Sequence, residues 1–506
     1  MVSGVSGAGR VGAAAQDALG EILGWLGGTA DPEPAIELSA LARNLDLLDG
    51  ARPGLLQLDR IVEDLGKRAG SSAAVLADRL TAPAGGSGVA DRRLVLDLAA
   101  LYGRIASICR KILEERDTAG AGSERPSLAT VARRALGCLY QQYRLSLLAG
   151  ASEPQGMWRD AHRWVREARR ELGPAEGGLP QSLELDRTYR EMLALAAVQP
   201  SGLSSRELAA AADYVARFAA TVEVTANAPA EVDFRLFWLD PGLDMAPIAL
   251  ARRRPPERRA VLYVSCARLG LLAAEQVREL EAGTAPEHLH LPPEASDAAY
   301  RGMLQRLHDA WVEPPSRQLV RRRNRYPVEV CIGFDAVRRL HAGGRDAAQA
   351  SPPQSAWNVI NESPTGFALI HEGGDPAGVL AGGVIALRKA ADRPWDVCVV
   401  RWLRKDEAGR IEAGVQAVGS RGRAVRIAFR GAREAVAPID GLLFPPASAV
   451  RAHEAILVSA GACVSRRFTL VTEEERTHVI QGRMVNLDLQ TGLVELFEFQ
   501  PDPYPI

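Results

Sequence analysis

Five arginines lie within nine residues, in the segment Arg317-Gln-Leu-Val-Arg321-Arg-Arg-Asn-Arg325. Only four of the 61 basic residues in the chain are Lys, so arginine is common throughout, yet a window of this length would hold about one. A guanidinium group offers planar, paired donors that suit phosphate oxygens and the edge of a guanine, and it also stacks on bases. A solvated basic linker would have the same composition, so the arginines alone do not assign a function.

A second polar pattern, Asn361-Glu-Ser363-Pro-Thr-Gly366, follows about 40 residues later. Side chains two residues apart at the end of a strand point the same way, so Asn361 and Ser363 would share one face. Gly366 permits a backbone conformation, or a close approach, that a Cβ would forbid. Taken alone, the pattern is that of an ordinary β-turn.

One small barrel would position both patterns. Tyr326, Val328, Val330 and Ile332 alternate with other residues, which predicts a strand directly after the last arginine. Six short strands in about 95 residues favour a closed antiparallel sheet. The second pattern then falls between the second and third strands. The five later strands are predicted at 356–361, 366–371, 382–389, 396–404 and 410–417.

An RxxxR ahead of the first barrel strand, followed by [D/N]xSxxG between the second and third strands, resembles the PilZ domain. The resemblance covers about 317–430 and implies a six-stranded antiparallel β-barrel that binds cyclic di-GMP. It implies that Arg321 and Arg325 grip phosphates and guanine edges, with Arg322 and Arg323 as alternates in a shifted register. It also implies that Asn361, Ser363 and Gly366 cradle a guanine. Asn in place of the commoner Asp keeps an acceptor but loses its charge.

The whole chain of 506 residues is predicted to be an α+β, multidomain protein. An N-terminal helical bundle or short solenoid precedes the barrel, and a β-rich extension follows it as a second β-domain or as part of the first. The helical region, with seven antiparallel helices, is expected to bind an unknown protein partner or to form a homodimer. The predicted parts are 1–30 (low-complexity, disordered or loosely helical), 31–227 (helical), 228–313 (an α/β connector or a completion of the helical domain), 314–435 (barrel) and 436–506 (extension).

Composition limits the other classes of function. Basic and acidic residues number 61 and 62, which argues against a general nucleic-acid coat protein. The six Cys lie at least 29 residues apart without a CxxC, which favours free thiols in a reducing cytoplasm. No apolar run is long enough for a membrane span, and the first residues do not form a secretory signal. Two binding alternatives remain open: a PilZ-like adaptor that binds no nucleotide, and a nucleic-acid binder that uses the arginines.

Enzyme motifs lack their contexts, so we expect a receptor rather than an enzyme. Gly7-Ala-Gly-Arg-Val-Gly12 matches a dinucleotide-binding pattern, but no strand precedes it. Cys266 resembles the nucleophile of a cysteine phosphatase, yet Leu272 stands where the loop needs Arg. His288 and His290 have no third metal ligand nearby in the sequence. We therefore predict no catalytic residue, no metal and no cofactor beyond the ligand itself.

The segment 314–325 suggests a switch. Repulsion between its arginines would keep it mobile, and a dianionic ligand would neutralise it and fix it on the barrel. The ordering would then reorient the upstream domains about Pro314 and Pro315.

Overall fold

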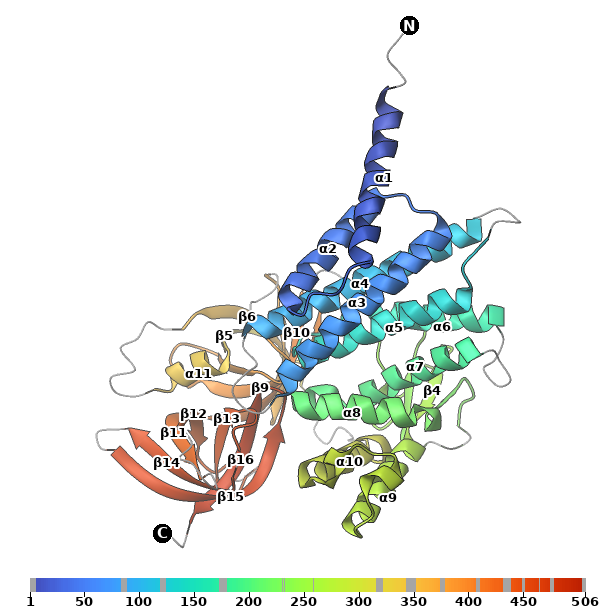
Figure 1. Cartoon of the computed structure of the whole chain (residues 1–506). Helices are drawn as coiled ribbons and strands as arrows, with labels where there is room; N and C mark the ends of the chain where they lie inside the picture. The colour runs from blue at the N-terminus through green and yellow to red at the C-terminus, as the bar shows by residue number, and fades with distance from the viewer. Residues whose placement is uncertain are drawn as a thin grey trace.

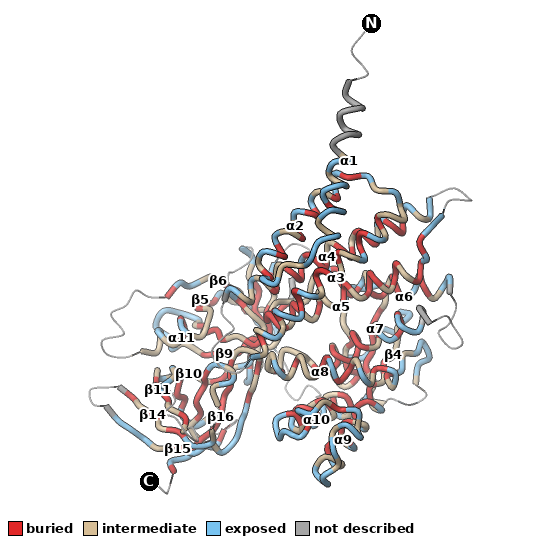
Figure 2. Tube along the Cα trace, in the orientation of Figure 1, coloured by how far each residue is buried: buried red, intermediate tan, exposed pale blue. Residues whose placement is uncertain are grey.

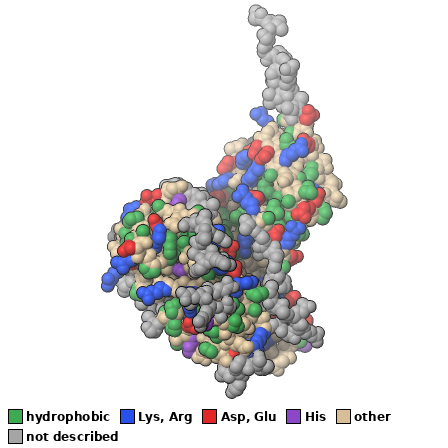
Figure 3. Space-filling view, turned by 90° about the vertical axis from the view of Figure 1, so that its left-hand side faces the viewer, with side chains coloured by type: hydrophobic (Ala, Val, Ile, Leu, Met, Phe, Trp, Pro, Cys, Tyr) green, Lys and Arg blue, Asp and Glu red, His purple; other side chains and the backbone are tan. Residues whose placement is uncertain are grey.

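A helical half and a half made of two β-barrels form the molecule (Figure 1). The fold comes from a computed structural model. It describes residues 6–82, 89–118, 124–172, 180–229, 231, 233–257, 259–314, 322–342, 352–373, 378–405, 410–430, 438–447, 451–463, 465–473 and 477–502. Buried residues follow the inner faces of the helices and run through both barrels (Figure 2). On the face formed by the barrels, charged side chains of both signs are interspersed (Figure 3).

The described helical region contains seven helices after α1, as many as were predicted, although the segment predicted at 70–82 is the second half of α3. Of the two states predicted for 1–30, disordered or loosely helical, the structure favours the helical one for α1, because Ile22 is fully buried while Trp25 and Leu26 pack against the same core. Short apolar anchors among Ala and Gly are easily missed in a low-complexity segment. The helices are α1 (Ser6–Leu26), α2 (Pro34–Gly50), α3 (Leu55–Thr81), α4 (Val89–Thr118), α5 (Leu128–Leu148), α6 (Met157–Leu172), α7 (Pro180–Ala197) and α8 (Ser205–Phe218), with the short 3-10 turns η1 (Pro200–Gly202) and η2 (Ala219–Thr221).

A buried ion pair joins α2 to α3. Arg68 donates through Nε to Glu37 at 2.6 Å and through a terminal nitrogen at 3.2 Å, and it also donates to the Gly28 carbonyl at 2.8 Å. Its guanidinium carbon lies 4.2 Å from the centre of the Trp25 ring. The Glu37 side chain is only 2% exposed. The pair therefore fixes the beginning of the helical domain.

Replacing Arg68 with methionine is expected to lower the free energy of unfolding of the helical domain by about 3–5 kcal/mol. Glu37 would remain buried without its partner, and losing one member of a buried pair costs about that much. Thermal and denaturant unfolding followed by circular dichroism measure the loss. Lys67→Met is the matched control, because Lys67 pairs with Glu63 and Asp64 on the surface and should change stability little. Equal losses in both variants would contradict the prediction.

Residues 223–312 complete the core of the helical domain. Trp311 is fully buried and its Nε1 donates to the Ala194 carbonyl at 3.0 Å, so α10 is bound to α7. Cys266 and Leu307 belong to the same apolar cluster. The antiparallel sheet has the order β1-β4-β2-β3. The elements are β1 (Glu223–Thr225), β2 (Leu236–Leu239), β3 (Ile248–Ala249), β4 (Leu262–Ser265), α9 (Ala267–Glu281), η3 (Pro286–Leu289), η4 (Pro293–Ser296) and α10 (Ala298–Val312).

The first barrel is closed and six-stranded, which confirms the predicted fold class. Its strands have the order β10-β7-β6-β5-β8-β9, and every neighbouring pair is antiparallel. Alternate residues such as Val328, Val330 and Val359 fill its interior. Its elements are β5 (Tyr326–Ile332), α11 (Phe334–Leu340), β6 (Gln354–Ser363), β7 (Gly366–His371), β8 (Val384–Arg388), β9 (Asp396–Lys405) and β10 (Ile411–Ser420).

The C-terminal residues form a second closed barrel with the order β11-β12-β13-β16-β15-β14. The boundary predicted between 435 and 436 is corrected, because β11 belongs to this second barrel. The barrels are joined by the tight turn at Arg421 and Gly422, with Arg421 at φ 62°, and a turn this short has no linker composition. The strands are β11 (Arg423–Phe429), β12 (Ile439–Phe444), β13 (Glu454–Ser459), β14 (Arg467–Glu473), β15 (Thr477–Gln490) and β16 (Val494–Pro501).

The two barrels share an apolar interface in addition to their separate interiors. Val397 and Val399 from β9 and Val337 from α11 pack in one cluster with Leu442 and Phe444 from β12. All five side chains are buried. The second barrel is therefore packed firmly against the first.

The helical half contacts the first barrel at β9 and at the turn before β8. The Ala381 amide donates to the Gly150 carbonyl at 2.6 Å, and the Ser201 hydroxyl donates to the carbonyl of Arg401 in β9. That turn is itself bound to β9, because the Gly382 amide donates to the Val400 carbonyl at 2.7 Å. We call these residues the β9 junction. Among the described residues, no helix is long and apolar enough to cross a membrane.

Candidate ligand-binding site

The turn between β6 and β7 is held by the residues of the second polar pattern. Ser363 and Gly366 are paired across the two strands, and the Ser363 hydroxyl donates to the Gly366 carbonyl at 3.2 Å. Asn361 and Ser363 lie within β6, which ends at Ser363, two residues beyond the strand end predicted from the sequence. Because they are two residues apart on one strand, their side chains leave the same face, as predicted.

Gly366 allows β7 and β10 to approach each other closely. A Cβ built on Gly366 would lie 2.1 Å from the Val415 carbonyl oxygen and 3.2 Å from the Gln416 Cα. Both atoms are backbone, so no side-chain rotation could relieve the clash. Gly366 does not have a positive φ. Of the two reasons for a glycine that the sequence suggested, close approach is therefore the correct one.

The arginine segment lies beside this turn. The Arg322 amide donates to the Glu362 carbonyl at 2.8 Å, and the Glu362 amide donates to the Arg322 carbonyl at 3.0 Å. This two-way bridge places Arg322–Arg325 along the end of β6, next to Asn361 and Ser363. The structure thus brings together the two patterns that are about 40 residues apart in the sequence. Arg317 and Arg321 lie outside the described residues.

The side chains of the described arginines are exposed. Arg322, Arg323 and Arg325 are all on the surface. Arg325 donates to Glu372 at 2.9 Å, but its side chain remains 69% exposed in this contact. An exposed pair of this kind contributes little free energy. The guanidinium of Arg325 can therefore leave the Glu372 carboxylate and bind another anion at a small cost in free energy.

Glu362 joins the two patterns through its side chain as well. It accepts from the Tyr326 hydroxyl at 2.6 Å, from the Asn324 amide at 3.1 Å and from Lys389 at 3.3 Å. The hydrogen bonds from Tyr326 and then Asn324 are the main reasons why the pKa of Glu362 falls to about 2. Lys389 also lies 4.7 Å from the centre of the Tyr326 ring. The sequence analysis did not single out Glu362 or Lys389, although Glu362 lies inside the second pattern.

An indole ring covers the outer face of the barrel in the same cross-strand row. Asn361 is paired with Ala368, Ala368 with Gly414, and Gly414 with Trp402. A Cβ on Gly414 would lie 1.9 Å from Trp402 Nε1, so the ring lies directly over this glycine. Two strand spacings, about 10 Å, separate Gly414 from Asn361. The sequence analysis noted Trp402 only as part of a strand, because the pairing with Gly414 depends on register.

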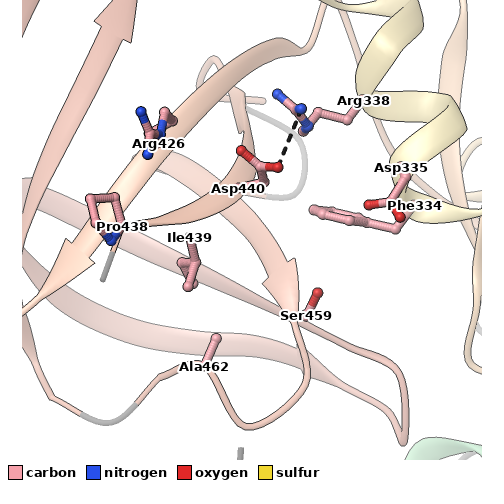
Figure 4. A pocket seen from close by; sticks show the side chains of 9 residues that line it. All are labelled: Phe334, Asp335, Arg338, Arg426, Pro438, Ile439, Asp440, Ser459 and Ala462. Carbon is pink, nitrogen blue, oxygen red and sulfur yellow. Dashed lines mark ion pairs between the residues drawn. The ribbon is translucent and has the colours of Figure 1, made fainter. Parts of the chain in front are cut away.

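A cavity of about 600 Å³ lies at the other end of β5, between α11 and the second barrel (Figure 4). Arg338 from α11 pairs with Asp440 from β12 at 3.2 Å across it. Arg426 and Asp335 also line it, so its positive and negative side chains balance. β5 begins directly after Arg325 and ends directly before α11, so this cavity is separate from the site at the arginine segment.

The other motifs do not form sites within the described residues. Gly7–Gly12 lie inside α1, where no strand-to-helix turn exists. Cys266 is fully buried, and burial raises its pKa to about 12, so a thiolate nucleophile is not available near neutral pH. His288 and His290 belong to no described group of three or more metal-ligating side chains. All six cysteines are free.

Two domain families match the chain. The family described as the N-terminal domain of the cyclic-di-GMP receptor FimW matches residues 20–230. The family described as the middle PilZ domain of the same receptor matches residues 341–423, a range that includes Asn361, Gly366 and Trp402 but begins after Arg325. Neither the curated proteins nor the solved structures contain a significant match.

Proposed function

Because the chain belongs to the PilZ family, with the N-terminal and middle domains of a FimW-type receptor, we propose that it binds cyclic di-GMP at the β6–β7 turn. The observation that carries the proposal is the two-way backbone bridge between Arg322 and Glu362. The bridge brings cationic donors to the strand that carries Asn361 and Ser363. A ligand with two phosphates and two guanines needs these two kinds of group side by side.

Each residue has a defined role in this proposal. Arg325 and Arg322 donate to phosphate oxygens or to a guanine edge, and Arg321 is assigned the same role on the resemblance alone. The Asn361 side-chain oxygen accepts from guanine nitrogens, and Ser363 presents its hydroxyl beside it. Gly366 keeps β7 close to β10, so the surface under the base remains flat. The indole of Trp402 offers an aromatic face in the same row.

Calorimetric titration of the purified chain with cyclic di-GMP tests the proposal. We expect a saturable heat that falls with rising salt concentration, because arginine–phosphate contacts are partly screened. GMP serves as a control for the need for two linked nucleotides. The absence of any heat at concentrations up to the millimolar range would leave the adaptor alternative as the better reading. Salt-dependent binding of unrelated DNA would instead favour the nucleic-acid alternative.

Replacing Asn361 with aspartate is expected to tighten cyclic di-GMP binding by about threefold to tenfold. A carboxylate keeps the acceptor position and adds the charge that roughly doubles the strength of a hydrogen bond from a guanine N–H. Calorimetry on both proteins at the same salt measures the change. Asn358→Asp, on the same strand, is the control for a general effect of added negative charge. Weaker binding only in Asn361→Asp would show that the residue does not face the base.

We extend the proposal to signal output through the helical domain. The β9 junction connects the barrel to the turn after α5 and to η1 by direct hydrogen bonds, which gives a physical route between the two halves. The ordering hypothesis for 314–325 now applies mainly to the residues before Arg322, since Arg322 and Asn324 are already hydrogen-bonded to Glu362 of β6. A protein partner, a homodimer and a cytoplasmic location all remain proposals. The protein-partner proposal is tested by purifying the tagged chain from cells, with and without cyclic di-GMP, and identifying the proteins that co-purify with it.

A further inference from the structure

One carboxylate holds the arginine segment in place before any ligand is considered. Glu362 bonds to Arg322 through its backbone in both directions. Its side chain accepts from Asn324, which lies inside the segment, and from Tyr326, which directly follows it. Lys389, directly after β8, also donates to this carboxylate. The segment is therefore tied to β6 at both ends of its described part.

The hydrogen bonds of the Glu362 side chain lie on the opposite face of β6 from the proposed ligand-binding face. Glu362 stands between Asn361 and Ser363 on one strand, so its side chain leaves the opposite face from theirs. On that face it meets Tyr326 and Lys389, and Lys389 also lies 6.0 Å from the Phe367 ring. The Glu362 side chain is 23% exposed. It can anchor the segment without occupying the place of a guanine.

We propose that Glu362 is a positioning residue of the cyclic di-GMP site, which presets the arginine segment on β6 so that the ligand meets ordered donors. This inference rests on the proposed function, because it concerns the same site. Presetting a loop raises affinity by removing the entropy cost of ordering it on binding. Glu362 fills a variable position of the NxSxxG pattern, so the pattern itself assigns it no role.

The proposal predicts an effect opposite in sign to simple electrostatics. Glu362 carries a negative charge near a site for a dianion, so by Coulomb's law alone its removal should tighten binding. Presetting predicts the reverse, since the arginines lose their fixed position. Salt separates the two effects further, because a Coulombic effect shrinks at high ionic strength while a positioning effect persists.

The experiment compares Glu362→Ala and Glu362→Gln with the unaltered chain. Calorimetry gives the cyclic di-GMP affinity at low and high salt, and hydrogen exchange without nucleotide reports on the amides of 322–326. We expect about tenfold weaker binding in Glu362→Ala, at both salt concentrations, with faster exchange of the Arg322 amide. Glu362→Gln should recover part of the affinity and part of the exchange protection, because its amide oxygen can still accept from Tyr326 and Asn324. Glu329→Ala is the matched control, since Glu329 pairs with Arg388 on the same barrel but does not contact the segment.

Two results would overturn the proposal. One is binding in Glu362→Ala that is equal to or tighter than in the unaltered chain. The other is unchanged exchange of the 322–326 amides, with thermal unfolding showing an intact barrel. If the unaltered chain itself binds no cyclic di-GMP, the proposed function fails, while the exchange data still decide whether Glu362 positions the segment.

Discussion

Replacing Arg325 with alanine is expected to weaken cyclic di-GMP binding by about 100-fold. A hydrogen bond between charged groups contributes about 1.5–3 kcal/mol, and each 1.4 kcal/mol is a factor of ten in affinity. Arg325 is ready for this role because its present partner, Glu372, holds it only on the surface. Calorimetry measures the loss, and thermal unfolding should be nearly unchanged.

Two further variants sharpen this result. Arg325→Lys keeps the charge but loses the planar pair of donors, so it should fall between the unaltered chain and Arg325→Ala. Arg426→Ala removes another exposed arginine, at the cavity between α11 and the second barrel, and should leave binding within twofold. An Arg325→Ala protein that binds nearly as well as the unaltered chain would move the arginine role to Arg321 or Arg322.

Replacing Gly366 with alanine is expected to lower the free energy of unfolding of the first barrel by about 3 kcal/mol. The new Cβ would meet the Val415 carbonyl oxygen, so β7 and β10 would have to separate. Overpacking a close contact typically costs about 1–3 kcal/mol, and a rigid backbone neighbour places this site at the upper end. The shift would also move Asn361 through its pairing with Ala368, so binding should be lost together with stability.

Denaturant unfolding monitored by tryptophan fluorescence measures the Gly366→Ala effect. Gly302→Ala is the control, because a Cβ there meets nothing within 4 Å and Gly302 lies inside α10. That change should leave stability unaltered or raise it by about 0.5–1 kcal/mol. An equally stable Gly366→Ala barrel that still binds the nucleotide would show that the β7–β10 spacing is adjustable.

The alternation of apolar residues was enough to predict the first barrel. Each of its six strands was located to within a few residues, because the interior is filled by every second side chain. The sequence did not decide whether the C-terminal strands form a second barrel or extend the first. The residues of β11 were assigned to the wrong barrel. Nothing in the local composition marks Arg421 and Gly422 as a domain boundary, since the turn is too short to form a linker.

The candidate site was predictable only in part, for a different reason. The resemblance supplied Arg325, Asn361, Ser363 and Gly366, and the structure brings them to one end of β6. The roles of Glu362, Lys389 and Trp402 depend on which residues face each other across strands. That register arises from the folded barrel, so it cannot be read from spacing along the chain.

The β9 junction makes the two halves of the molecule thermodynamically linked if β9 moves on binding. Trp402 lies over Gly414 on the proposed ligand-binding face, while its neighbour Arg401 is bound through its carbonyl to Ser201 of the helical half. Coupling between two binding events is reciprocal, so a partner that favours one position of Ser201 must change nucleotide affinity by the same factor that the nucleotide changes partner affinity. If such a partner exists, its concentration in the cell would then help to set the concentration of cyclic di-GMP at which the proposed receptor responds.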